Sequence, residues 1–117
     1  MAGKLTTHVL DTAAGRPAAG MKVDLFRSAG AARELVKSAV TNADGRLNEP
    51  LLIGGDLKKG EYVLLFHVGD YFKKVKSKAA RKFLDRVPVV FTVADAKANY
   101  HVPLLVSPWA YSTYRGS

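Results

Sequence analysis

The sequence predicts a mainly β protein, a sandwich of antiparallel sheets with one short helix. Roughly seven or eight short segments alternate apolar with polar residues, as half-buried strands do. Turn residues separate these segments, and a single stretch instead repeats its apolar residues at steps of three and four. Many short strands with one helix are typical of a β-sandwich.

The first half of the chain supplies three strand candidates. Leu5–Asp11 is rich in β-branched residues and alternates, so one row would face a core and the other row, which includes His8, would face outward. Met21–Arg27 alternates apolar with charged residues, as expected of a half-exposed antiparallel strand. Glu34–Thr41 is a third candidate, although its composition would also tolerate a helix. A small, glycine-bearing loop is expected at 28–32.

A tight turn is predicted at Asn42–Arg46. Its Asp-Gly pair supplies the positive φ that such turns need, and the turn presents Arg46 at its exit. A short strand is expected next at Leu51–Ile53, followed by an interior strand at Glu61–Val68.

The helix is predicted at about residues 70–83. Its apolar stripe would consist of Phe72, Val75, Ala79 and Phe83. Six of the ten residues from 73 to 82 are Lys or Arg, and most lie off that stripe.

The chain then returns to strands and closes with a hairpin. Asp85–Val93 is expected to be a strand, with Pro88 tolerated near its start or on a sheet edge. Tyr100–Val106 alternates cleanly, Ser107-Pro108 marks a turn, and Trp109–Tyr114 is predicted to return beside it. This hairpin either merely completes a sheet or holds the last four residues against the folded body.

Composition narrows the protein class. The 117 residues, 48% hydrophobic and 24% charged, are expected to form one soluble domain spanning residues 1–117. The chain has no cysteine, which rules out disulfides and thiolate metal sites. No secretory signal or membrane-spanning run is visible, so the expected location is cytoplasmic. The net charge of +8 predicts attraction to anions without choosing among them.

The candidate chemistry depends on three histidines. His67 falls in a strongly apolar segment and is expected to be structural. His8 and His101 each lie on the less apolar face of a strand, so they either share one outer surface or are unrelated surface residues. They and Arg46 do not suggest a metal site, because no third ligand is apparent and an arginine would repel the ion.

Several motifs together resemble one family. They are the segments Thr7–Asp11, Thr41–Arg46, Phe83–Pro88 and Tyr100–Leu105, then Ser107-Pro108 and the closing Tyr-Arg-Gly-Ser. This set is similar to the transthyretin-related 5-hydroxyisourate hydrolases nearly from end to end. The C-terminal tetrapeptide distinguishes those enzymes from the hormone-carrying transthyretins. The basic stretch Lys73–Lys82 departs most from the family pattern.

The resemblance implies a transthyretin-like sandwich of two four-stranded antiparallel sheets, assembled as a homotetramer (a dimer of dimers) with active sites at the dimer–dimer interface. It also implies hydrolysis of the lactam bond of 5-hydroxyisourate to 2-oxo-4-hydroxy-4-carboxy-5-ureidoimidazoline in urate catabolism, with no cofactor. The positions that match the family's catalytic residues are His8, Arg46, His101 and Ser117. Those that match its substrate-binding tail are Tyr114, Arg115 and Gly116.

Elementary chemistry supports these assignments. Lactam hydrolysis needs an activated water, a stabilised oxyanion and a proton for the departing nitrogen. Two histidines can move protons near neutral pH, and a guanidinium can bind an anionic substrate and oxyanion. Which histidine is the base, and whether Ser117 acts through its hydroxyl or its carboxylate, stays open.

Three alternatives compete with the hydrolase. A non-catalytic carrier would not need two histidines, an arginine and an intact tail. A nucleic-acid-binding module could use Lys73–Lys82, but the nearby phenylalanines fit a buried helix stripe better than stacking platforms, so no nucleic-acid partner is expected. A sandwich without any site would leave the residue set unexplained.

Overall fold

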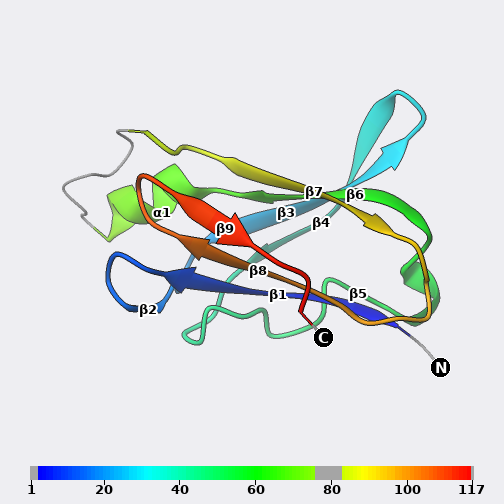
Figure 1. Cartoon of the computed structure of the whole chain (residues 1–117), viewed down its shortest axis with the longest axis horizontal. Helices are drawn as coiled ribbons and strands as arrows, with labels where there is room; N and C mark the ends of the chain where they lie inside the picture. Colours follow the sequence, from blue (N-terminus) through cyan, green and yellow to red (C-terminus); the bar gives the residue numbers. More distant parts are fainter. Residues whose placement is uncertain (1–2, 76–82, 117) are drawn as a thin grey trace.

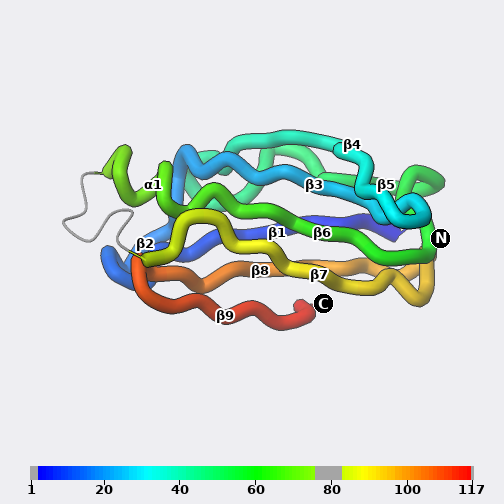
Figure 2. The backbone as a smooth tube through the Cα atoms, turned by 90° about the horizontal axis from the view of Figure 1, so that it is seen from above, coloured from blue at the N-terminus to red at the C-terminus, as the bar shows by residue number. Residues whose placement is uncertain are grey.

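Two β-sheets pack face to face in the computed structural model, which describes residues 3–75 and 83–116. Figure 1 looks at the open edge of this sandwich, with β7 at the edge of the upper sheet and β9 at the edge of the lower one. Figure 2, turned by 90°, shows the strands running along the long axis of the molecule. The predicted mainly β sandwich is confirmed.

The upper sheet has four strands in the order β4-β3-β6-β7, and all its neighbours are antiparallel. Its strands are β3 (Lys22–Ala29), β4 (Ala32–Val40), β6 (Gly60–Phe66) and β7 (Val87–Val93). The composition of 34–41 left a helix open, and the structure makes this segment a strand. The loop expected at 28–32 is shorter than predicted, because β3 and β4 run to within two residues of each other.

The lower sheet has five strands and differs from the prediction. Its path is β2-β1-β8-β9, and β5 also pairs with β1. Its strands are β1 (Lys4–Asp11), β2 (Arg16–Pro17), β5 (Leu52–Ile53), β8 (Tyr100–Val106) and β9 (Tyr111–Thr113). A short 3₁₀ helix, η1 (Gly54–Asp56), follows β5.

The pair β1 and β8 is parallel, so the prediction of purely antiparallel sheets is wrong here. The whole upper sheet forms between these two strands in sequence, which lets the chain re-enter the lower sheet from the same end. The register joins Leu5 to Tyr100 and Thr6 to His101. Two segments from opposite ends of the chain therefore place their outward rows side by side.

The inward rows make the core between the sheets. Leu5 and Val9 of β1, Leu104 of β8, and Leu25 and Phe66 of the upper sheet have no exposed surface. Burying a side chain of this size contributes on the order of 1.5–3 kcal/mol. The core thus holds β1 and β8 firmly in register, while the outward-facing Thr6, His8 and His101 stay half-buried.

The helix is shorter than predicted and begins earlier. The described helix α1 covers Val68–Lys74. It can begin at Val68 because β6 already ends at Phe66. Tyr71 and Phe72 are buried, whereas Val75 is 39% and Phe83 69% exposed, so these two do not belong to a buried stripe. Ala79 and most of the basic stretch lie outside the described residues. Among the described residues no helix is long and apolar enough to cross a membrane.

The C-terminal hairpin forms as predicted, with a shorter second strand. The backbone amides of Trp109 and Ala110 donate to Oγ of Ser107, which closes the turn. After β9 the chain continues along β8 in the same antiparallel register, where the amide of Gly116 donates to the carbonyl of His101 at 2.7 Å. The tail is therefore held against β8.

Candidate active site

The outer face of β1 and β8 brings two of the predicted residues together. Thr6 and His8 are on the outward row of β1, and His101 is the cross-strand neighbour of Thr6. Oγ1 of Thr6 lies 2.8 Å from Nδ1 of His101. The two candidate histidines therefore share one surface, as expected if they act together.

The turn at 42–46 docks on this face and places Arg46. The amide of Val9 donates to the carbonyl of Gly45 at 2.8 Å, and Arg46 pairs with His8 in an isolated antiparallel bridge. Oδ1 of Asn42 accepts hydrogen bonds from the amides of Asp44 and Arg46, which fixes the shape of the turn. Gly45 has φ 74°, and any Cβ there would collide with the carbonyl oxygen of Val9. The Asp-Gly signal thus corresponds to a close backbone approach.

His8 is oriented by the same turn. Its Nε2 lies 2.8 Å from the carbonyl oxygen of Asp44. Because a carbonyl can only accept, Nε2 carries the hydrogen of this bond. The lone pair of a neutral His8 ring is consequently on Nδ1.

Gly116 of the tail packs directly on the other histidine. A Cβ at this position would lie 2.7 Å from Cδ2 of His101 and 3.1 Å from its Cβ. Only a glycine lets the backbone lie this close to the imidazole. The tail therefore contributes to the position of His101, while Ser117 lies outside the described residues.

Tyr114 and Arg115 lie elsewhere in this chain. Nη2 of Arg115 donates to the carbonyl of Asn99 at 3.2 Å, and the guanidinium carbon is 4.5 Å from the centre of the Tyr100 ring. Both residues line a cavity of about 310 Å³ between the open edges of the two sheets, together with parts of β7 and β8. They are not among the residues that line the pocket beside His101 and Arg46.

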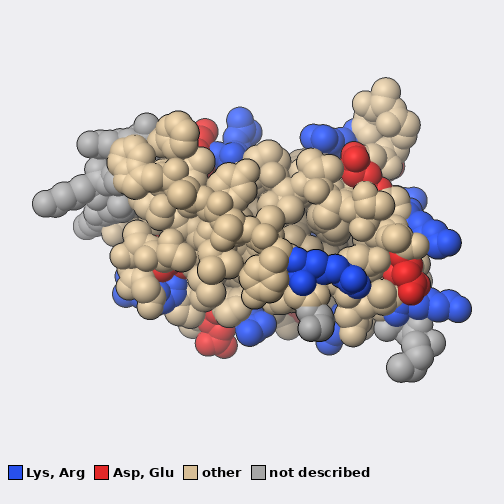
Figure 3. Space-filling view, viewed as in Figure 1, with Lys and Arg blue, Asp and Glu red and all other residues tan. Residues whose placement is uncertain are grey.

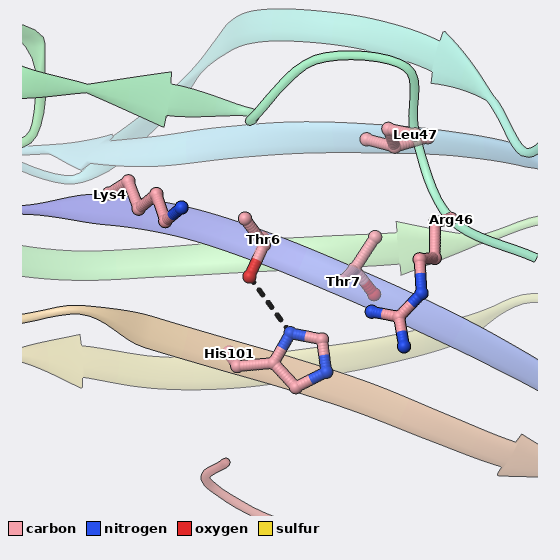
Figure 4. Close-up of a pocket in the computed structure, with 6 residues that line it drawn as sticks. All are labelled: Lys4, Thr6, Thr7, Arg46, Leu47 and His101. Atoms are coloured by element: carbon pink, nitrogen blue, oxygen red, sulfur yellow. Dashed lines mark hydrogen bonds between the residues drawn. The ribbon is translucent and has the colours of Figure 1, made fainter. Parts of the chain in front are cut away.

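That pocket is an open hollow of about 300 Å³ on the outer face (Figure 4). It is lined by Lys4, Thr6, Thr7, Arg46, Leu47 and His101. Figure 4 shows Arg46 and Leu47 to one side of β1 and His101 on β8, with the second ring nitrogen of His101 turned toward the Arg46 side. The volume is at the lower end of the range for small-molecule sites.

Four of these lining residues were missed in the sequence. Thr6 was placed on the outward row with His8, but its contact with His101 depends on the parallel register, which alternation does not reveal. Thr7 belongs to a family motif but was given no role there, and Lys4 and Leu47 carry no signal beyond lying next to motif residues.

The site is positively charged and keeps His101 neutral. Burial lowers the pKa of His101 below 6.5, and the positive charges of Arg46 and His8 lower it further. Within the described part of the chain, no acidic side chain lines the pocket. The imidazole of His101 is thus free to accept a proton near neutral pH, beside a permanent cation.

His67 lies apart from this site. Its Nε2 donates to Oδ2 of Asp24 at 2.8 Å, and Oγ of Ser38 donates to Oδ1 of the same carboxylate at 2.6 Å. Burial alone would raise the pKa of Asp24, but the hydrogen bonds from Ser38 and His67 outweigh it and hold the pKa below 3.8. This placement agrees with the structural role predicted for His67.

Within residues 3–75 and 83–116, no three His, Asp or Glu side chains gather as a metal site would require. The prediction of a metal-free, cofactor-free site stays a prediction.

The two-sheet sandwich with one short helix, and a histidine–arginine pocket on the outer face of one sheet, define a transthyretin-like protein with an enzyme-like site. A model of the HIUase/Transthyretin family matches residues 5–116. The chain belongs to this family, which confirms the resemblance seen in its motifs.

Individual relatives agree over nearly their whole length. A 5-hydroxyisourate hydrolase of Deinococcus radiodurans is 58% identical over 113 residues, which are 97% of this chain and 95% of that protein. The 5-hydroxyisourate hydrolase 2 of Rhizobium meliloti is 55% identical over 116 residues, 98% of this chain and 97% of that protein. The solved structure of Klebsiella pneumoniae 5-hydroxyisourate hydrolase superposes with a TM-score of 0.82 at 32% identity, covering 98% of this chain and 99% of that one.

Proposed function

We propose that this chain is a 5-hydroxyisourate hydrolase, an enzyme that opens the lactam bond of 5-hydroxyisourate to give 2-oxo-4-hydroxy-4-carboxy-5-ureidoimidazoline. The observation that carries the proposal is the pocket in which His101, with its lowered pKa, lies beside Arg46 under the packed tail. The relatives named above support the same reaction over almost the full chain.

In the proposed reaction, His101 and His8 move the protons. A neutral imidazole takes a proton from a water molecule, whose oxygen forms a bond to the lactam carbonyl carbon. The C–N bond of the tetrahedral intermediate then breaks, and the proton is returned to the departing nitrogen. The second proton of the water is released to solvent when the new carboxylic acid ionises to a carboxylate, so the proton balance closes without a covalent intermediate, metal or cofactor.

Arg46 is proposed to bind the anionic substrate and the oxyanion. Its guanidinium is permanently charged and can donate two parallel hydrogen bonds, and no carboxylate among the pocket residues neutralises it. Negative charge that develops on the carbonyl oxygen is therefore stabilised where it forms. Ser117, two residues beyond Arg115, is proposed to hold water or substrate through its hydroxyl or its carboxylate, and Tyr114, Arg115 and Gly116 to line the complete site.

A homotetramer, a dimer of dimers, is proposed as the working assembly. The strands β7 and β9 are open sheet edges, which offer unpaired backbone groups to another copy. Figure 3 shows that the face with these edges is largely uncharged around one prominent basic group. Exposed apolar residues along it are Val90, Trp109, Tyr111 and Tyr114. Light scattering after size exclusion would give four times 12.7 kDa, and a 12.7 kDa particle would contradict the assembly.

The cellular role proposed is urate breakdown, because the substrate arises from urate by oxidation. The location proposed is the cytoplasm. Fractionation of cells that carry the native gene would test the location.

The decisive experiment follows the ultraviolet decay of freshly generated 5-hydroxyisourate, made from urate with urate oxidase. The intact chain is compared with a variant lacking Arg115, Gly116 and Ser117. Rapid decay that is lost on truncation supports the hydrolase and the role of the tail. Decay at the spontaneous rate with intact, folded protein would overturn the proposed function.

A further inference from the structure

We propose that Thr6 is a positioning residue that holds His101 with its proton on Nδ1, so that Nε2 is free to take a proton from water. The inference rests on the proposed function and adds a residue that lies just outside the family motifs. Its basis is the contact of 2.8 Å between Oγ1 of Thr6 and Nδ1 of His101.

The register of the strand pair fixes the position of this contact. Thr6 and His101 are directly opposite each other in the parallel pair, and buried neighbours on both sides, Leu5 and Val102, lock the two strands. The carbonyl of His101 is also occupied by the amide of Gly116 at 2.7 Å. His101 is thus held by the hydrogen bond to its backbone carbonyl, by the packing of Gly116 on the imidazole and by the contact of Thr6 with Nδ1.

The chemistry of the partner matters as much as its position. A hydroxyl oxygen is able to accept a hydrogen bond from Nδ1–H both when the ring is neutral and when it is an imidazolium, so this partner suits the proposed tautomer in both states. It adds no negative charge, so it does not stabilise the imidazolium as a carboxylate would. The ring can therefore give the proton back to the leaving nitrogen readily.

The charged groups around His101 are consistent with that arrangement. Arg46 from the turn and His8 from β1 both disfavour a positive ring and lower the pKa of His101 after burial. Lys4, at the other side of the same pocket, is a further cation. Among the described residues that line the pocket, no carboxylate opposes them.

The neighbouring hydroxyl shows what an ordinary strand threonine does. Thr7 points the other way and donates to the carbonyl of Val102 at 2.7 Å, a bond between side chain and backbone. Thr113 on β9 likewise donates to the carbonyl of Pro103 at 2.6 Å. Thr6 instead uses its hydroxyl on an imidazole that faces a pocket.

The test compares Thr6→Val, which removes the hydroxyl at nearly constant shape, with Thr6→Ser, which keeps it. Thr113→Val is the matched control, since it removes a hydroxyl that also bonds to β8 but does not touch His101. Steady-state kinetics are measured with 5-hydroxyisourate across pH. Nitrogen-15 NMR of the imidazoles of the substrate-free protein reports which ring nitrogen carries the proton.

For Thr6→Val we expect kcat to fall about tenfold to a hundredfold, because a mispositioned general base lowers the catalytic rate by about that factor. KM should change less than kcat. The NMR signal of His101 should move from the Nδ1–H toward the Nε2–H tautomer. Thr6→Ser should restore both readouts, and Thr113→Val should keep the tautomer and the shape of the pH profile.

Two results would overturn the role of Thr6: a Thr6→Val variant with the kcat and pH profile of the parent chain, or a parent His101 already in the Nε2–H form. A parent chain that does not hydrolyse the substrate would overturn the proposed function instead. The NMR readout needs no turnover, so the two failures are distinguishable.

Discussion

His101 and His67 are two histidines in similar local geometry with opposite surroundings. Each is half-buried beside a sheet and makes one hydrogen bond of 2.8 Å to a side chain of a neighbouring strand. The partner of His67 is the carboxylate of Asp24, whereas the partner of His101 is the hydroxyl of Thr6. The difference in partner charge separates a structural histidine from one that can exchange a proton.

The wider surroundings repeat this contrast. Around His67, Asp24 supplies negative charge and is itself stabilised by Ser38, so the hydrogen bond from His67 to this carboxylate joins β3 to the chain that follows β6. Around His101, burial, Arg46 and His8 all disfavour a charged ring. The cluster around His67 stabilises the negative charge of Asp24. The cluster around His101 favours the neutral imidazole, which can accept a proton.

Replacing each histidine by asparagine is the strongest test of this contrast. His101→Asn should lower kcat by roughly a hundredfold to ten-thousandfold, the usual contribution of a general acid–base. His67→Asn should keep kcat close to that of the parent chain. Both are measured by the decay of 5-hydroxyisourate, and comparable losses in the two variants would show that the comparison is wrong.

The packing of the tail on His101 gives the next largest effect. In Gly116→Ala the new methyl group would lie 2.7 Å from Cδ2 of His101, so the ring must turn away. We expect kcat to fall about tenfold to a hundredfold with a small change in stability, because a displacement of about 1 Å suffices for such a loss.

Gly55→Ala is the matched control for this substitution. A Cβ at Gly55 meets nothing within 4 Å, and its backbone does not require glycine. If both variants retained full activity, the contact between tail and histidine would be irrelevant to catalysis.

Much of this architecture could be predicted from the sequence, because alternation and turn residues depend on local physics. The Asp44-Gly45 pair predicted the turn that presents Arg46, and the outward rows of two segments predicted that His8 and His101 could share a face. The family motifs supplied the rest of the candidate site.

What failed to follow from the sequence depends on long-range pairing. Alternation is the same in parallel and antiparallel strands, so the β1–β8 pairing and with it the contact of Thr6 with His101 were not foreseeable. The predicted apolar stripe of the helix included too many residues, because periodicity does not reveal which apolar residues are buried in the core. Val75 is partly exposed and Phe83 is largely exposed.

The hydrogen bond between His67 and Asp24 should matter for stability rather than for rate. Removing this hydrogen bond to a charged partner in His67→Asn is expected to cost about 1–3 kcal/mol in the free energy of unfolding near pH 7. Urea unfolding followed by tryptophan fluorescence measures it.

The loss in the free energy of unfolding caused by His67→Asn should become smaller as the pH falls. The pKa of Asp24 is depressed below 3.8 in the folded chain, so its contribution is present above 3.8 and is lost as pH falls through the folded pKa. The gap between the parent chain and His67→Asn should therefore narrow in acid. A gap that stayed constant to the lowest pH would contradict a stabilising hydrogen bond from His67 to the Asp24 carboxylate.

The smallest expected effect is a shift in the pH profile, and it separates the two histidines most directly. If neutral His101 is the base, kcat/KM falls with decreasing pH around a folded pKa that lies below 6.5. Arg46→Gln removes one cause of that depression, so its acid limb should move upward in pH, alongside a lower plateau. In His67→Asn the limb should not move, because its partner Asp24 belongs to the other sheet. An acid limb above 6.5 in the parent chain, or one unmoved by Arg46→Gln, would mean that the cationic surroundings of His101 do not set its proton affinity.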